Sequence, residues 1–198
     1  MKKNSVVFLV LTLAFLLSGC AKVPQTEIDA ARAAIEKAKQ AQADVYMETE
    51  YAALTDSMNV INAEIETNKG KLFKGFSDVK TKLAAVESRA DKLVGDTQAR
   101  KDTIKEEVNT TLVNLQALAN ENNALVEKAP RGKEGKAAID AIKSELAVID
   151  TTAAQLSGLL KNGDLLTAQT KAKTAYSKAV SLNTELKTVI EKYKQKQK

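Results

Sequence analysis

The chain has 198 residues, of which 44% are hydrophobic, 28% are charged and only 4% are aromatic, and it contains one cysteine but no histidine or tryptophan. The formal charge of +5 falls to +3 without Lys2 and Lys3, and acids alternate with bases, which excludes a nucleic-acid interface of clustered bases and stacking aromatics. The lack of histidine excludes Ser-His and Cys-His nucleophilic sites and the usual zinc sites, so we expect no enzyme, no metal and no cofactor. Ala, Leu, Lys, Glu and Gln dominate, which indicates an all-α fold of long helices.

The N-terminal segment has the order of a secretory signal peptide. Lys2 and Lys3 precede an apolar run, Val6–Leu17, and two small residues follow it. The run is too short to span a membrane as a helix, which takes about 20 apolar residues. We therefore expect residues 1–19 to be a signal peptide that is removed by cleavage.

The residues that close this segment are Leu17-Ser18-Gly19-Cys20, and Cys20 is the only cysteine in the chain. They resemble the lipobox of bacterial lipoproteins. That resemblance implies cleavage between Gly19 and Cys20, a diacylglycerol thioether on the sulfur and an acylated amine. Two or more acyl chains give stable membrane anchoring. Ala21, where an Asp tends to mean inner-membrane retention in that family, favours the outer membrane and the periplasm. The alternative is an unlipidated signal peptide with a chance cysteine.

After the signal, residues 20–25 are expected to form a lipidated tether and residues 26–198 a single domain. Thr26 is a candidate N-cap for a first helix over 26–68, because acidic residues follow it in the first turn. Lys69-Gly70-Lys71 is the expected break, since glycine permits the left-handed conformation that ends helices.

A second helix is predicted over 72–128 from an apolar 4-3 spacing that is typical of a heptad seam. The spacing weakens at Gly95, Thr97 and Arg100, so we expect a bend or soft spot near Gly95, which costs about 1 kcal/mol inside a helix. The seam residues before and after this point are Leu72, Phe76, Val79, Leu83, Val86, Ala90 and Leu93, and then Ile104, Val108, Leu112, Leu115, Leu118 and Leu125.

Pro130 to Gly135 reads as a loop, and a third helix is predicted over 136–161. Gly163 is expected to cap it, and Asp164 to start a fourth helix over 164–195, which gives an antiparallel hairpin. The predicted seam of the fourth helix is rich in alanine in its first half, so this helix can approach a neighbour closely. Its members are Leu165, Ala168, Ala172, Ala175, Ala179, Leu182, Leu186, Val189 and Tyr193. The whole chain is thus predicted to be an elongated antiparallel helical bundle of coiled-coil hairpins, with about four helices and one very long central helix.

Residues from Pro24 to about Asp91 resemble a family of short, alanine-rich helical envelope lipoproteins. The matching positions are Ala31, Ala34, Ile35 and Ala38, followed by Val45-Tyr46-Met47-Glu48. The family tends to have an Ala-Tyr-Ala-Pro-Glu segment here, which implies a helix break. The proline is missing in this chain, with Glu48 near its place.

Two further features are candidate contact sites. Phe73 and Phe76, at the bend before the long helix, either plug the end of the bundle or form an exposed anchor for a partner. The basic end of the chain is either a frayed tail or a contact to anionic glycan or lipid. It contains Lys192, Lys194, Lys196 and Lys198. This end is similar to that of the major outer-membrane lipoprotein family, whose last lysine is joined to peptidoglycan, and Lys198 would be its equivalent.

These features together predict a non-enzymatic, lipid-anchored helical spacer or adaptor of the cell envelope that contacts partner proteins or glycan. One alternative is a peptidoglycan tether that acts through the basic tail. Another is a lipoprotein that binds a small ligand in a pocket between its helices, although the aliphatic seams have few inward polar groups.

Overall fold

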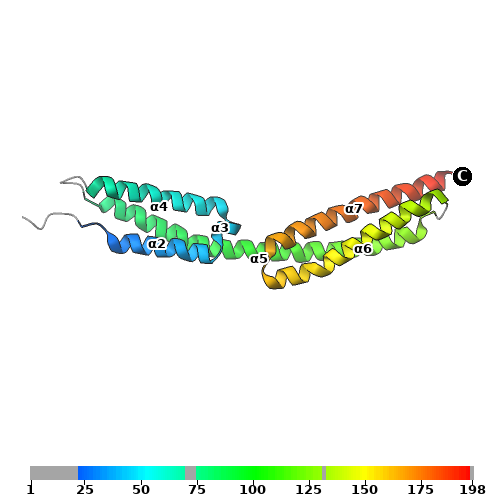
Figure 1. Ribbon diagram of the computed structural model, residues 1–198, viewed down its shortest axis with the longest axis horizontal. Helices are drawn as coiled ribbons and strands as arrows, with labels where there is room; N and C mark the ends of the chain where they lie inside the picture. The colour runs from blue at the N-terminus through cyan, green and yellow to red at the C-terminus, as the bar shows by residue number, and fades with distance from the viewer. Residues whose placement is uncertain (1–21, 70–74, 131–132, 197–198) are drawn as a thin grey trace, which may run out of the picture. The chain divides into compact units, whose positions relative to one another are not determined.

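The computed structural model describes residues 22–69, 75–130 and 133–196, and this part of the chain is all-α, without a strand (Figure 1). The prediction of an all-α chain with one long helix is therefore confirmed. The count of about four helices is wrong, because the described residues form six. They are α2 (Gln25–Gln40), α3 (Ala43–Tyr46), α4 (Glu48–Lys69), α5 (Ser77–Lys128), α6 (Lys133–Asn162) and α7 (Leu165–Lys196). In the described part of the chain, each helix is too short or too polar to cross a membrane.

The chain divides into two compact units, one ending at Arg100 and the next beginning at Lys101, where a single domain over 26–198 was expected. The division falls where the buried face of α5 has polar residues in place of aliphatic ones. Thr97 is fully buried and donates from Oγ1 to the Leu93 carbonyl at 2.6 Å, and half-buried Arg100 follows before the seam resumes at Ile104.

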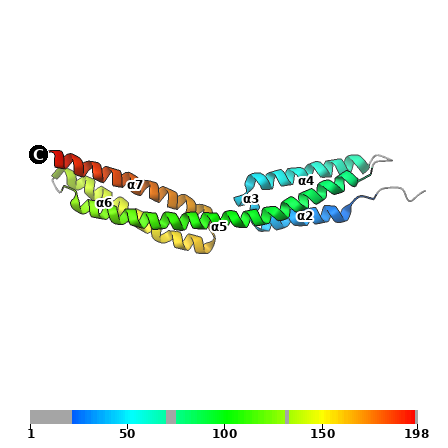
Figure 2. The same ribbon diagram turned by 180° about the vertical axis from the view of Figure 1, so that it is seen from behind.

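The first unit contains α2, α3, α4 and the N-terminal part of α5. Figures 1 and 2 show α2 and α4 alongside this part of α5. Ion pairs link α5 to both neighbours, with Lys80 Nζ 2.6 Å from Glu27 of α2 and Lys82 Nζ 2.5 Å from Glu64 of α4. The apolar core confirms the first half of the predicted seam of the long helix where it is described. Its residues are Phe76 (just before α5), Val79, Leu83, Val86, Ala90 and Leu93. In the second half of the seam Ile104, Val108 and Leu115 are buried, whereas Leu112, Leu118 and Leu125 are half-buried.

The helix predicted over 26–68 is interrupted twice, so that prediction is wrong. Gln42 adopts a left-handed conformation with φ of 70° directly after α2, and Met47 leaves the helical region with φ of −138°. The chain thereby reverses, and α4 packs back against α2 with Ala43 fully buried in the turn. The second break lies at the Val45-Tyr46-Met47-Glu48 segment.

The helix starts also differ from the prediction. Thr26 lies inside the first turn of α2, because the Pro24 carbonyl already accepts the backbone N–H of Ile28 at 3.1 Å. The long helix begins at Ser77 instead of residue 72, with the Phe76 carbonyl accepting from Lys80, while Leu72 lies outside the described residues. The loop before α6 ends earlier than residue 135, since α6 begins at Lys133.

Gly95 does not interrupt α5, which is helical from Ser77 to Lys128. A Cβ added at Gly95 would meet no atom within 4 Å, so no close packing requires a glycine there. The helix is therefore continuous through Gly95, and the expected bend or soft spot there stays a prediction.

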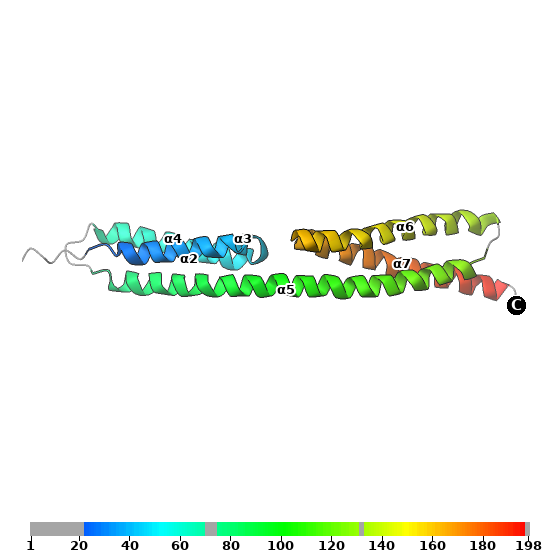
Figure 3. The same cartoon turned by 90° about the horizontal axis from the view of Figure 1, so that it is seen from below.

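The second unit contains the C-terminal part of α5 together with α6 and α7 (Figure 3). Lys178 of α7 pairs with Glu145 of α6 at 3.0 Å, and Lys187 of α7 pairs with Glu121 of α5 at 2.7 Å. The core joins all three helices through Leu115, Val126, Ile142, Leu146, Ile149, Ala175, Ala179, Leu182 and Leu186. The predicted seam of the fourth helix is confirmed as far as Leu186, but Tyr193, its last predicted member, is 44% exposed.

The turn between α6 and α7 confirms the predicted glycine cap. Gly163 has φ of +78°, its N–H bonds the Leu160 carbonyl at 3.2 Å, and the Asp164 N–H bonds the Leu159 carbonyl at 3.0 Å. This pair of bonds is the Schellman motif that satisfies the last carbonyls of a helix. Asp164 directly precedes α7, and its carbonyl accepts from Ala168 at 3.0 Å. The motif reverses the chain, so that α7 runs back beside α6 in an antiparallel pair.

Candidate functional site: the groove between α6 and α7

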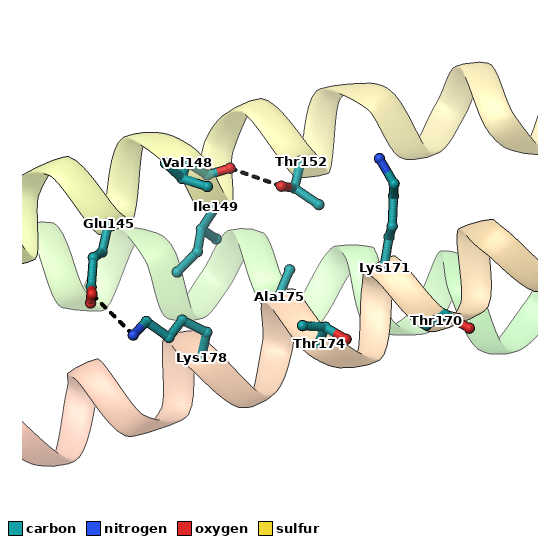
Figure 4. Close-up of a pocket in the computed structure, with 9 residues that line it drawn as sticks. All are labelled: Glu145, Val148, Ile149, Thr152, Thr170, Lys171, Thr174, Ala175 and Lys178. Carbon is teal, nitrogen blue, oxygen red and sulfur yellow. Dashed lines mark hydrogen bonds and ion pairs between the residues drawn. The ribbon is translucent and has the colours of Figure 1, made fainter.

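A groove of about 440 Å³ lies between α6 and α7 in the second unit (Figure 4). Its lining is apolar at the centre, with threonines and charged side chains around it. The residues are Glu145, Val148, Ile149 and Thr152 from α6, and Thr170, Lys171, Thr174, Ala175 and Lys178 from α7.

Helical periodicity explains why these residues share one groove. On α6, Glu145, Val148 and Thr152 are three and four positions apart, and so they lie on one face next to the buried Ile149. On α7, Thr170, Thr174 and Lys178 repeat at intervals of four. The seam of α7 beside them consists of alanines, which fill little space between the helices and leave a hollow.

Two polar contacts cross from one helix to the other. Lys178 Nζ lies 3.0 Å from Glu145 Oε1, and Lys171 Nζ donates to the side-chain oxygen of Gln155 at 3.3 Å. Figure 4 draws the first of these contacts, together with the bond from Thr152 Oγ1 to the Val148 carbonyl of its own helix at 2.9 Å. The Thr152 hydroxyl is thus occupied within α6, and the centre of the groove keeps its apolar surface.

The groove has a net positive rim. Lys178 is neutralised by Glu145, whereas the contact across the groove from Lys171 is to a neutral amide. The Lys178–Glu145 pair is half exposed, with side-chain exposures of 51% and 44%, so water screens it and its contribution to stability is small.

A buried polar network connects α5 and α7 in the same unit. Asn122 Nδ2 donates to the Ala179 carbonyl at 2.9 Å, and Asn183 Nδ2 donates to Asn122 Oδ1 at 2.8 Å. Hydrogen bonds first from Lys187 and then from Asn183 hold the pKa of Glu121 below its usual 4.5. Asn122 is fully buried, a position that the apolar seam predicted from the sequence does not include because asparagine is polar. Asn122 lies three residues after Ala119 and four before Val126, and this heptad spacing indicates a buried position.

Among the predicted site residues that the structure describes, Phe76, Lys192 and Lys194 do not line the groove. Gly19, Cys20, Phe73 and Lys198 fall outside the described residues. Phe76 is 6% exposed and belongs to the core of the first unit, so it is not an exposed anchor, and the structure agrees with its packing role.

The basic end of the chain is helical up to Lys196, where α7 ends, and does not fray at residue 192. Lys192 and Lys194 are exposed on this last part of α7. They are available to an anionic surface, although no contact in the structure identifies one.

Within residues 22–69, 75–130 and 133–196, no three His, Cys, Asp or Glu side chains gather where they could hold a metal ion. The chain matches no protein-family model, no curated protein and no solved structure. The resemblance to helical lipoproteins therefore stays a prediction from the sequence.

Proposed function

We propose that this chain is a lipid-anchored, non-enzymatic helical spacer or adaptor of the bacterial cell envelope. The observation that carries the proposal is the segment Leu17-Ser18-Gly19-Cys20 after the apolar run Val6–Leu17. In this proposal the signal is cut before Cys20, whose sulfur carries diacylglycerol and whose amine is acylated. Ala21 favours the outer membrane, with the protein facing the periplasm.

The composition of the helices supports a role in contact rather than in catalysis. The chain has no histidine, and its only cysteine is assigned to the lipid. Apolar and alanine side chains fill the two cores, while charged residues pair on the helix surfaces. Such helices offer long mixed-charge faces to partner proteins or glycan. A spacer needs length, so the proposal includes an elongated antiparallel bundle, which small-angle scattering of the mature chain tests.

A second candidate is a tether to peptidoglycan through the basic tail. The exposure of Lys192 and Lys194 at the end of α7 favours it, with Lys196 and Lys198 as the remaining contacts. Purification of the glycan, followed by its enzymatic digestion, tests this candidate. The candidate predicts either that the protein is retained on the purified glycan or that digestion releases protein joined to a muropeptide. Glycan without bound protein contradicts it.

The anchor is tested by replacing Cys20 with Ala. We expect Cys20→Ala to abolish palmitate labelling and to release the protein from membranes, because no sulfur remains for the thioether. Ser18→Ala is the matched control, since a small residue still precedes the cleavage site and labelling should persist. If Cys20→Ala still labels and still sediments with membranes, the lipid anchor is wrong.

A further inference from the structure

A large apolar side chain of α6 that is mostly exposed lines the groove. Val148 is 64% exposed beside the buried Ile149, on a surface that α7 flanks with Thr174 and Ala175. Burying such a side chain is favourable, and the groove supplies apolar neighbours for whatever covers it. The groove was not among the sites that the sequence indicated.

We propose that the groove between α6 and α7 binds an acidic amphipathic helix of a partner protein. This inference rests on the proposed adaptor function and gives it a surface and a class of partner.

The dimensions of the groove fit a helix. Its lining runs from Thr170 to Lys178 on α7 and from Glu145 to Thr152 on α6. Eight residues rise about 12 Å, or a little over two turns. A helix that lies in this groove contacts it with apolar residues at i, i+3 or i+4, and i+7, which is the usual pattern of helix-in-groove recognition.

The charges select an acidic partner. Lys171 and Lys178 lie seven residues apart on α7, two turns along the same face, whereas the groove has one carboxylate, Glu145, already paired with Lys178. Lys171 contacts a neutral amide across the groove, so an incoming carboxylate gains a charge-assisted bond there. Two copies of the chain that meet groove to groove are a poorer pair, because both grooves present the same net positive charge.

The openness of the groove argues against a small ligand. Small-molecule sites bury most of the ligand surface within a concave pocket. Here the apolar side chain of Val148 remains 64% exposed, so the groove does not enclose a small molecule.

Site-specific photo-crosslinking in intact cells tests the proposal with the full chain. A photo-reactive amino acid replaces Val148 in one strain and Val113 in another. Val113 of α5 is the matched control, because it is 65% exposed and does not line the groove. We expect a discrete adduct from position 148, at least tenfold stronger than from position 113. The crosslinked peptide should map to an amphipathic helix with net negative charge.

Charge reversal completes the test. Lys171→Glu should lower the yield of the adduct about tenfold, whereas Lys161→Glu, an exposed lysine outside the groove, should leave it unchanged. The docking proposal is overturned by no adduct at 148, equal adducts at 148 and 113, or a crosslink to a lipid, a second copy or a basic segment. An unchanged yield in Lys171→Glu also contradicts it. Both positions are exposed, and circular dichroism checks that the variants keep their helix content.

The same strains separate this proposal from the adaptor function. Palmitate labelling of the position-148 variant reports the anchor independently of docking. A crosslink to a partner from Val60, which is 66% exposed in the first unit, with none from 148, would leave the adaptor function standing and reject the groove. Loss of labelling would reject the anchor whatever the crosslink shows.

Discussion

Asn183 donates a hydrogen bond from Nδ2 to Oδ1 of Asn122 at 2.8 Å, although 61 positions separate the two residues. Asn122 in turn donates to the Ala179 carbonyl, so the two amides join α5 to α7 inside an otherwise apolar interface. Buried polar groups are costly unless they are paired, and this pairing is possible in only one register of the two helices.

Removal of one amide should therefore cost more than removal of both. Asn122→Ala removes one acceptor of the buried Asn183, which keeps only its bond to Glu121, and we expect the second unit to lose about 1–3 kcal/mol of stability. Replacing both residues by Leu removes the unpaired group and should restore most of that loss, because matched apolar replacements can be nearly neutral. Urea denaturation of Asn122→Ala, of Asn183→Ala, of the variant with both residues changed to Ala and of the variant with both changed to Leu measures the coupling. An Asn122→Ala variant as stable as the unchanged protein would contradict the account.

Gly95 is predicted to weaken α5 locally, and the packing around it does not require a glycine. Because a Cβ at this position meets no atom within 4 Å, Gly95→Ala should stabilise the protein by up to about 1 kcal/mol, as alanine has the higher helix propensity. Thermal denaturation followed by circular dichroism measures the shift. A destabilised Gly95→Ala would mean that α5 bends at this position.

Gly163 supplies the contrasting case. Its surroundings are equally open, but its φ of +78° is a conformation that other residues adopt only with strain. We expect Gly163→Ala to destabilise the second unit by about 1–2 kcal/mol. Equal stability of Gly163→Ala and the unchanged protein, in the same melting experiment, would show that the Schellman turn does not hold α6 and α7 together.

Because Lys187 pairs with Glu121, the stability of the fold should depend on the protonation of Glu121. The pKa of Glu121 is lowered in the folded protein, chiefly by the hydrogen bond from Lys187. A carboxyl group with a lowered pKa stabilises the fold above its unfolded value, near 4.5, and this stability is lost as the pH falls through the lower folded pKa. In Lys187→Met the pKa should move up toward 4.5. NMR titration of the Glu121 carboxyl carbon follows it, and an unchanged midpoint would show that Lys187 does not cause the shift.

The bridge across the groove should matter little to folding. Lys178 and Glu145 are both about half exposed, so Lys178→Met should change the free energy of unfolding by less than about 1 kcal/mol. Ala172→Leu is the contrasting variant, because Ala172 is 1% exposed in the alanine seam and added methylenes cost about 1–3 kcal/mol. If Lys178→Met lost more stability than Ala172→Leu, the Lys178–Glu145 pair would be needed to hold α6 against α7, and the groove would have a structural role instead of a binding role.

The features predicted best from the sequence depend on local spacing. The heptad positions from Val79 to Leu93 are buried, and Gly163 ends its helix, because helical periodicity and backbone freedom act over a few residues. The break at Gln42 was missed because no glycine or proline marks it. A glutamine there takes the left-handed conformation, and the packing of α4 against α2 accompanies it.

The groove and the Asn122–Asn183 pair could not be read from a single helix. Both depend on which faces of α5, α6 and α7 meet, and residues such as Val148 and Lys171 look like ordinary surface positions in the sequence. The proposed lipid anchor is the opposite case, since the residues from Leu17 to Cys20 that indicate it are adjacent in the sequence.

Intact-mass spectrometry of the protein purified from membranes tests the central claim most directly. The account predicts a mature chain that begins at Cys20 and carries the added mass of a diacylglycerol and one further acyl chain. A chain that begins at Met1, or that is cleaved at another residue and carries no lipid, would contradict it.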